Sequence, residues 1–134
     1  MERVAERLAS AKSALATLKA VKKKRVSAED ARDLRILRFT YTFEAVWKAA
    51  QALLAEEHAT QLASPKLVIR AIGDFGLLSV DDAAWALKMA NDRNLAAQVY
   101  NEELALGLNS RIDDHIALLS RWLKAMQASM GGRR

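Results

Sequence analysis

The chain has 134 residues, one proline and five glycines, and 51% of its residues are apolar. This composition suits a single compact domain with a real hydrophobic core. Because the chain contains no cysteine, disulfides and a zinc site built from thiolates are excluded. No apolar run approaches the roughly 18 residues of a membrane span, and the N-terminal segment carries acids and lacks the apolar centre of a secretory signal. We therefore expect a cytoplasmic protein that does not interact with membranes.

The positive charge of the chain is concentrated in its first half. The formal net charge is +5. Residues 1–70 hold 14 Lys or Arg against eight Asp or Glu, whereas residues 71–134 hold seven against eight. Part of the excess is the run Lys22–Arg25. Such a run attracts phosphates or an acidic protein surface, or it serves as a solvated connector, and the sequence leaves both interpretations open.

Two helices are predicted before residue 58. Residues 2–21 combine strong helix formers with apolar residues at helical spacing, which predicts a first helix. Ser27 is a good N-cap, and acids follow it in the first turn of a second helix that runs to about Glu57. At about 1.5 Å per residue, a helix of that length spans the whole domain.

The second helix is predicted to be central, because it carries two apolar stripes and so is covered from more than one side. One stripe consists of Leu34, Leu37, Tyr41, Ala45 and Ala52; the other consists of Ile36, Phe39, Phe43, Trp47, Ala50 and Leu54. The charged residues Arg38, Glu44 and Lys48 lie close to these stripes. They must be paired, face a groove or a partner, or extend to solvent from the helix flank.

Three further helices follow a polar loop at residues 58–64. Ser64 and Pro65 begin the third helix, which Gly76 ends. Ser79 caps a fourth helix that continues to about Asp92. The last helix begins near Gln98 or Asn101 and continues to about residue 130, and residues 131–134 form a disordered tail.

These elements define one helical domain at residues 1–130. No segment alternates in the manner of a strand, so the fold class is an all-α, antiparallel up-and-down bundle of four to five helices. The long apolar seams of the second and last helices exceed what a small bundle covers, which favours a homodimer.

The sequence contains no recognisable motif for catalysis or for cofactor binding. The two histidines, His58 and His115, have no acidic or histidine neighbour at metal-ligand spacing, so we expect a loop residue and a packing residue. The sequence contains no glycine-rich phosphate loop and no nucleophile elbow. It therefore predicts no metal site, no cofactor and no catalytic residue.

Three segments together resemble the nucleotidyltransferase substrate-binding proteins of the HEPN (higher eukaryotes and prokaryotes nucleotide-binding) superfamily. They are residues 38–48 (RFTYTFEAVWK), residues 92–102 (DRNLAAQVYNE), and residues 64–70 with 75–78 between them. The resemblance implies a dimeric helical bundle whose partner is a separate small nucleotidyltransferase, often from a neighbouring gene. In many such pairs, the helical protein is a toxin ribonuclease and the transferase is its antitoxin.

The ribonuclease motif of the superfamily is Arg, four to six residues, then His, with a Tyr two residues later that some transferases adenylylate. Here Arg93 and Asn94 match and Tyr100 occupies the tyrosine position, but Gln98 replaces the histidine. Glutamine cannot exchange a proton near neutral pH, whereas an Arg can still hold a phosphate. The resemblance therefore implies a non-catalytic subunit that binds a nucleotide or another substrate. The expected phosphate-binding residues are Arg93, Asn94, Gln98, Glu44 and Lys48, and Tyr100 is the expected adenylylation site.

Three alternatives remain open. In the first, the chain is a HEPN ribonuclease toxin in which Gln98 orients the scissile phosphate of an RNA. In the second, it is a helical scaffold whose only activity is dimerisation. In the third, purely structural alternative, Arg93 pairs with a helix C-terminus or with an acid such as Glu44, and Tyr100 packs with its hydroxyl bonded.

Overall fold

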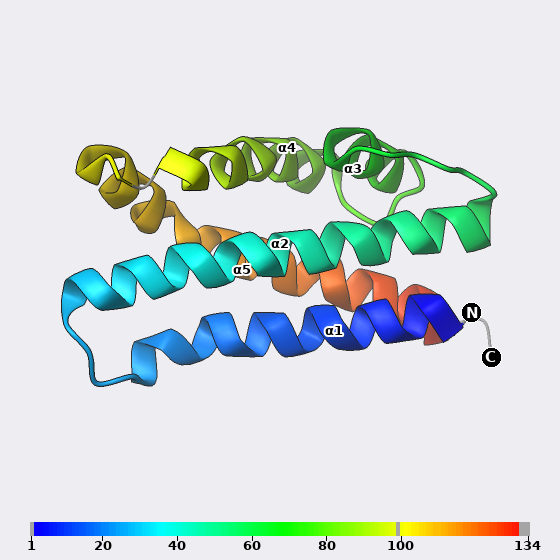
Figure 1. The fold of residues 1–134 in the computed structure, drawn as a ribbon. Coiled ribbons are helices and arrows are strands. Elements are labelled where there is room, and N and C mark those ends of the chain that lie inside the picture. Colours follow the sequence, from blue (N-terminus) through cyan, green and yellow to red (C-terminus); the bar gives the residue numbers. More distant parts are fainter. Residues whose placement is uncertain (1, 99, 132–134) are drawn as a thin grey trace.

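The computed structural model describes residues 2–98 and 100–131 of the chain (Figure 1). Five α-helices and two short 3₁₀ helices make up the ordered elements. They are α1 (Glu2–Lys19), η1 (Ala20–Lys23), α2 (Ala28–His58), α3 (Pro65–Asp74), α4 (Val80–Leu95), η2 (Ala96–Gln98) and α5 (Glu102–Gly131). Within this described part there is no strand, which confirms the predicted all-α bundle.

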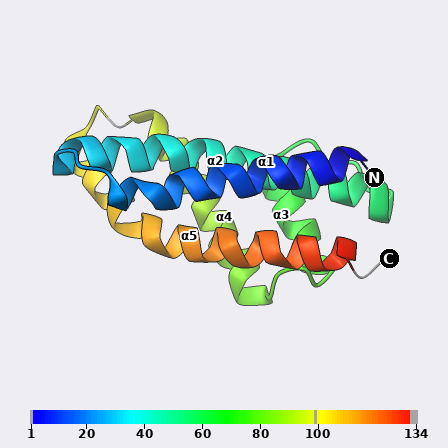
Figure 2. The ribbon, with the colours of Figure 1, turned by 90° about the horizontal axis from the view of Figure 1, so that it is seen from below.

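The fold resembles a four-helix bundle in which two shorter helices, α3 and α4, together take the place of one helix. Helices α1 and α2 lie side by side and run in opposite directions, and α5 completes the bundle (Figures 1 and 2). The beginning of α1 and the end of α5 lie at the same end of the molecule. Helix α2 contacts α1, α3, α4 and α5, so it is the central helix that the sequence predicts. None of the described helices is apolar over a stretch long enough to cross a bilayer.

Side-chain caps fix where four of the helices begin. The hydroxyl oxygen of Ser27 accepts a hydrogen bond from the backbone N–H of Asp30, and that of Ser79 accepts one from Asp82. The distance from nitrogen to Oγ is 3.0 Å in both. Ser64 caps α3 in the same way and is followed by the helix's first residue, a proline. Asn101 caps α5 through its Oδ1, 3.1 Å from the backbone nitrogen of Leu104. Each cap satisfies a backbone donor that has no partner inside the helix, and the three serine caps are the predicted ones.

Two helix ends differ from the expectation. Helix α4 continues to Leu95 instead of ending near Asp92, because no glycine or proline interrupts that turn, so Arg93 and Asn94 lie in a helix and not in a loop. The last part of the predicted first helix is the 3₁₀ helix η1. Helix α5 includes Gly131, and the other residues of the predicted tail, 132–134, lie outside the described residues.

The core forms around one stripe of α2. All six members of the Ile36–Leu54 stripe are buried. The other stripe divides: Ala52 is buried, whereas Leu37 and Tyr41 are 59% and 40% exposed. The largest fully buried side chains include Trp122, Phe39 and Phe43. The N-terminal half of α2 therefore has one face in the core and one face that other helices of the chain do not cover.

Candidate functional site

The last turn of α4 lies against the middle of α2. There Arg93 forms an ion pair with Glu44, through the Nη2 and Oε1 atoms. The same guanidinium donates from Nη1 to Asn94 Oδ1 at 3.2 Å, and Trp47 Nε1 donates to Glu44 Oε2 at 3.2 Å. The side chains of Arg93 and Glu44 are 35% and 26% exposed, so the pair is reachable from solvent.

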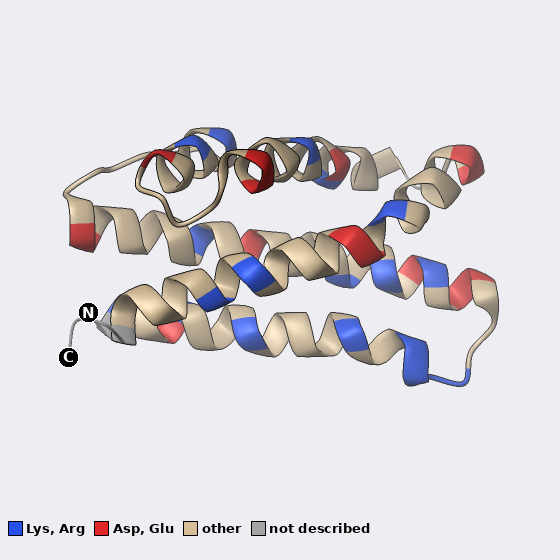
Figure 3. Ribbon diagram, turned by 180° about the vertical axis from the view of Figure 1, so that it is seen from behind, with Lys and Arg blue, Asp and Glu red and all other residues tan. Residues whose placement is uncertain are grey.

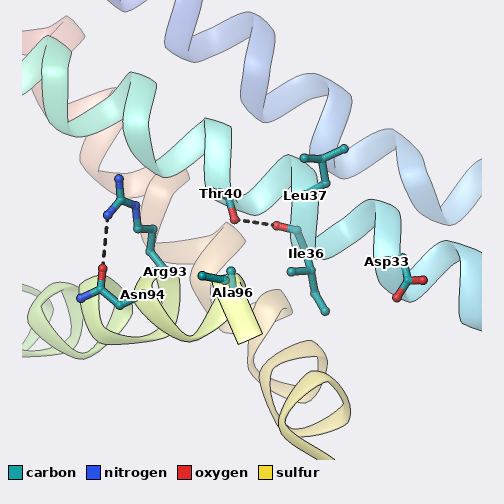
Figure 4. Close-up of a pocket in the computed structure, with 8 residues that line it drawn as sticks. Asp33, Ile36, Leu37, Thr40, Arg93, Asn94 and Ala96 are labelled. Atoms are coloured by element: carbon teal, nitrogen blue, oxygen red, sulfur yellow. Dashed lines mark hydrogen bonds between the residues drawn. The ribbon is translucent and has the colours of Figure 1, made fainter. Parts of the chain in front are cut away.

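Two hollows open on either side of Arg93 and Asn94. We call the larger one the Arg93 groove; its volume is about 440 Å³, and it lies between α2 and the α4–η2 junction (Figure 4). Its lining residues are Asp33, Ile36, Leu37, Thr40, Arg93, Asn94, Ala96 and Ala97. The smaller hollow, about 220 Å³, lies toward the start of α3, where Ser64, Pro65 and Lys66 line it.

The Arg93 groove is apolar along its walls and polar at its ends. Ile36, Leu37 and two alanines form the walls. Thr40 donates its hydroxyl to the carbonyl of Ile36 at 3.0 Å, so it does not present a free donor. The guanidinium of Arg93 and the carboxylate of Asp33 are the charged groups of the lining. Such a groove suits a flat apolar group that carries an anionic group at its Arg93 end.

The other predicted site residues do not line this groove, although Glu44 reaches it through its ion pair with Arg93. Lys48 is exposed on α2, one turn beyond Glu44. Gln98 is exposed at the end of η2. Tyr100 is 85% exposed in the turn before α5. Arg38 points to α1, where it donates to the carbonyl of Thr17 at 2.8 Å. The fold therefore brings Arg93, Asn94 and Glu44 together, and it leaves Lys48, Gln98 and Tyr100 on the surface.

A buried cluster next to Arg93 is not evident from the sequence. Asp92 accepts two hydrogen bonds from Arg111, one from Nε and one from Nη2, each at 2.8 Å. Its Oδ2 also lies 2.7 Å from Nε2 of His115. His115 is 1% exposed and stacks on Phe39, with 5.1 Å between the ring centroids. His115 is thus the packing residue that the sequence predicts, but it also has a carboxylate partner, 23 residues away in the chain, that no spacing rule reveals.

The protonation states in this cluster follow from burial and pairing. Burial lowers the pKa of His115, and this outweighs the attraction of Asp92. Burial by itself would raise the pKa of Asp92, but the hydrogen bonds and charges of Arg111 and His115 reverse the direction and lower it. A carboxylate only accepts hydrogen bonds, so Nε2 of the neutral imidazole is the donor. No three acidic or histidine side chains of the described residues are grouped as metal ligands.

The stability of the fold should decrease in acid because of His115. Its pKa is lowered from 6.5 in the folded chain, so unfolding takes up a proton at pH values below about 6.5. The contribution of neutral His115 to the free energy of unfolding is complete above that pH. It is lost as the pH falls toward the pKa that His115 has in the folded chain. Asp92, with its lowered pKa, acts in the same direction at still lower pH. Urea denaturation between about pH 7 and 5 should therefore show a falling free energy of unfolding.

A matched pair of variants isolates this histidine. His115→Gln keeps a donor for Asp92 but cannot titrate, so its free energy of unfolding should change less over that interval. His58→Gln replaces the other histidine, which stacks on Phe75 with 3.8 Å between the ring centroids. Because this variant keeps His115 and Asp92, the decrease that they cause should remain. If the free energy of unfolding of His115→Gln decreased between about pH 7 and 5 as much as that of the unmodified chain, His115 would not be the group that causes the decrease.

Comparison with known proteins places the chain in a family. The family model described as "Nucleotidyltransferase substrate binding protein like" matches residues 6–128. A crystal structure of a protein from Thermus thermophilus is similar, at 44% sequence identity and a TM-score of 0.79, covering 85% of this chain and 96% of that one. No curated protein matches the sequence significantly.

Two more distant structures share the fold. One is a mutant of the toxin–antitoxin MntA–HpeT, at 17% identity and a TM-score of 0.77, covering 96% of this chain and 99% of that one. The other is the tri-AMPylated Shewanella oneidensis HEPN toxin in complex with MNT antitoxin, at 15% identity and a TM-score of 0.73, covering 93% and 96%. The match over residues 6–128, together with the Thermus relative, shows that this chain belongs to the nucleotidyltransferase substrate binding protein-like family.

Proposed function

We propose that this chain is a non-catalytic, nucleotide- or substrate-binding subunit that pairs with a small nucleotidyltransferase in a toxin–antitoxin-like module. The observation that carries the proposal is the Arg93 groove, where a partly exposed guanidinium and Asn94 border an apolar hollow of about 440 Å³. The family description supports a nucleotidyltransferase as the partner. The similarity to a HEPN toxin that is bound to MNT antitoxin, and to MntA–HpeT, supports a toxin–antitoxin module.

Nucleotide binding would use both the polar end of the groove at Arg93 and its apolar walls. Arg93 has five N–H donors, and its contacts with Glu44 and Asn94 engage only Nη2 and Nη1. The remaining donors can contact a phosphate, while the base packs along Ile36 and Leu37. Glu44 orients the guanidinium but also repels a phosphate, because both are anionic. Lys48 lies outside the groove, one turn of α2 beyond Glu44, so it adds positive charge to the same helix without lining the groove.

The absence of an accessible imidazole near Arg93 supports the non-catalytic role. The chain contains two histidines. His115 is buried under Asp92 and Phe39, and His58 stacks on Phe75 at the end of α2. Gln98 has no proton to exchange at neutral pH. Within one chain, the groove can therefore hold a phosphate without an accessible imidazole beside it.

Tyr100 is the proposed site of adenylylation by the partner. Its side chain is 85% exposed in the turn that precedes α5, so another protein can approach its hydroxyl. Incubation with the transferase from the neighbouring gene and ATP, followed by mass spectrometry, should detect AMP on Tyr100. The variant Tyr41→Phe is the matched control, because the hydroxyl of Tyr41 is engaged with Thr17 at 2.6 Å.

The assembly is expected to contain two copies of this chain. Leu37 on α2 and Leu106 on α5 are 59% and 54% exposed, and large exposed apolar side chains support an interface. Light scattering measures the mass of the chain alone and of its mixture with the transferase. A monomeric mass, or no complex at about micromolar concentration, would count against the proposed partners.

Binding of ATP, measured by calorimetry, tests the groove itself. Arg93→Ala should weaken binding by at least about tenfold, because a hydrogen bond to a charged group contributes about 1.5 kcal/mol or more. Glu44→Gln keeps the shape of the side chain and removes its negative charge, so it should strengthen binding about threefold. Arg70→Ala removes an exposed Arg of α3 and should leave the affinity unchanged.

Two results would contradict the proposal. If the unmodified chain fails to bind ATP and other nucleoside phosphates at about millimolar concentration, the groove is not a nucleotide site. If the chain cleaves tRNA or mRNA, and Arg93→Ala abolishes the cleavage, then the ribonuclease alternative is correct and Gln98 does not prevent catalysis.

A further inference from the structure

A second groove lies on the opposite side of the bundle from the Arg93 groove, between α1 and α5. Its volume is about 240 Å³. Lys12 and Lys19 line it from α1, and Lys124 lines it from α5. Leu15 and Leu123, both buried, form its floor. We call this hollow the basic groove.

The cations of the basic groove have no acidic neighbours in the sequence. Residues 8–28 contain six Lys or Arg and no Asp or Glu, and residues 115–131 contain two and none. The residues that line the basic groove include no Asp or Glu. Figure 3 shows this face, with basic positions along α1 and the connector and on the second half of α5. The positive potential here is therefore not neutralised by the chain itself.

The positive charge extends along a line. Lys12 and Lys19 are seven residues apart on one helix, so they share a face and lie about 10 Å apart along its axis. Beyond them, η1 and the connector continue the line with the run Lys22–Arg25, whose four side chains are all exposed. Such a row of cations matches a ligand that carries a repeated negative charge.

We propose that the basic groove binds a single strand of nucleic acid through its phosphates. A groove with cations on both walls, continued by a basic track, fits a narrow polyanion that enters between the helices. No aromatic side chain lines the groove, so the bases would not stack there, and binding would be independent of sequence and sensitive to salt.

An anionic membrane surface fits this face less well. Membrane binding by a helix combines basic residues with large exposed apolar ones. The exposed large apolar side chains of the described chain are Val26, Leu37, Tyr41, Leu67, Phe75, Val80, Tyr100 and Leu106. None of them belongs to α1 or to the second half of α5. Val26, which follows the Lys22–Arg25 run, is the one residue of that list on this face, and one valine is less than the set of large apolar anchors that a membrane requires.

Fluorescence anisotropy with a labelled deoxythymidine strand of about 20 nucleotides tests the proposal. The double variant Lys12→Gln, Lys124→Gln should weaken binding at least about tenfold at about 50 mM salt. It should also reduce the slope of log K against log salt by about 1.4, because each lost phosphate contact removes about 0.7 for a single strand. The affinity of this double variant for ATP should equal that of the unmodified chain. The strand assay therefore tests the basic groove separately from nucleotide binding in the Arg93 groove.

A second double variant controls for net charge. Arg70→Gln, Lys88→Gln removes two exposed cations from α3 and α4 and changes the net charge by the same amount. It should bind the strand as the unmodified chain does. Equal weakening in both double variants would overturn the proposal, because it would mean that binding follows total charge. Displacement of the strand by polyglutamate at equal charge concentration would also overturn it, because the groove would then suit an acidic protein surface.

Discussion

Replacing Asp92 with alanine is expected to lower the free energy of unfolding by about 3 kcal/mol, the lower end of the range for breaking a buried ion pair. Asp92 accepts three hydrogen bonds, two from Arg111 and one from His115. Without the carboxylate, the buried imidazole loses its partner, and a buried polar group without a partner is unfavourable. The Arg111 side chain is 42% exposed, so water compensates part of the loss, which places the effect at the lower end.

The control for this variant is a similar pair on the same two helices. Asp82 accepts two hydrogen bonds from Arg121, each at 3.0 Å, but the Arg121 side chain is 54% exposed. Asp82→Ala should therefore cost less than about 1 kcal/mol. Urea denaturation of both variants measures the difference. Equal losses would mean that burial of Asp92 contributes nothing beyond the ion pair.

Replacing Phe39 with alanine should lower the free energy of unfolding by about 3–5 kcal/mol, as is usual for a buried aromatic side chain. Phe39 is fully buried, stacks on His115 and lies 6.4 Å from the ring of Phe43. The variant removes the side chain that supports the imidazole on one side, so it leaves a cavity next to the Asp92 cluster.

Leu37→Ala is the matched control for Phe39→Ala. Leu37 lies two residues away on the same helix but is 59% exposed in the single chain, so at concentrations where the chain is monomeric its replacement should change the free energy of unfolding by less than about 0.5 kcal/mol. Circular dichroism during thermal and urea unfolding measures both variants. A loss at Leu37 comparable to that at Phe39 would show that the exposed stripe of α2 is covered in solution, which would itself support a dimer.

Local features of the sequence determined the helices. Ser27, Ser64 and Ser79 cap helices because each side chain bonds to a backbone nitrogen three residues away. The apolar spacing of α2 identified two stripes because side chains three and four residues apart share a helical face, but only the Ile36–Leu54 stripe is buried throughout, whereas Leu37 and Tyr41 of the other are exposed. Such interactions depend only on neighbours in the chain, so the sequence alone predicts the all-α bundle and its central helix. The predicted end of α4 is three residues early, since no glycine or proline marks it.

Only the tertiary structure decided how the polar groups pair. Arg93 meets Glu44 across 49 positions of sequence, and Asp92 meets Arg111 and His115 across 19 and 23. The Arg93–Glu44 pair is one of the alternatives that the sequence leaves open, whereas nothing in the sequence indicates the Asp92 cluster. Which helix faces meet depends on how the helices rotate and pack against each other, and the periodicity of one helix carries no information about that. The resemblance thus supplied Arg93 and Asn94 of the Arg93 groove, and the packing of α4 against α2 supplied the other residues that line it.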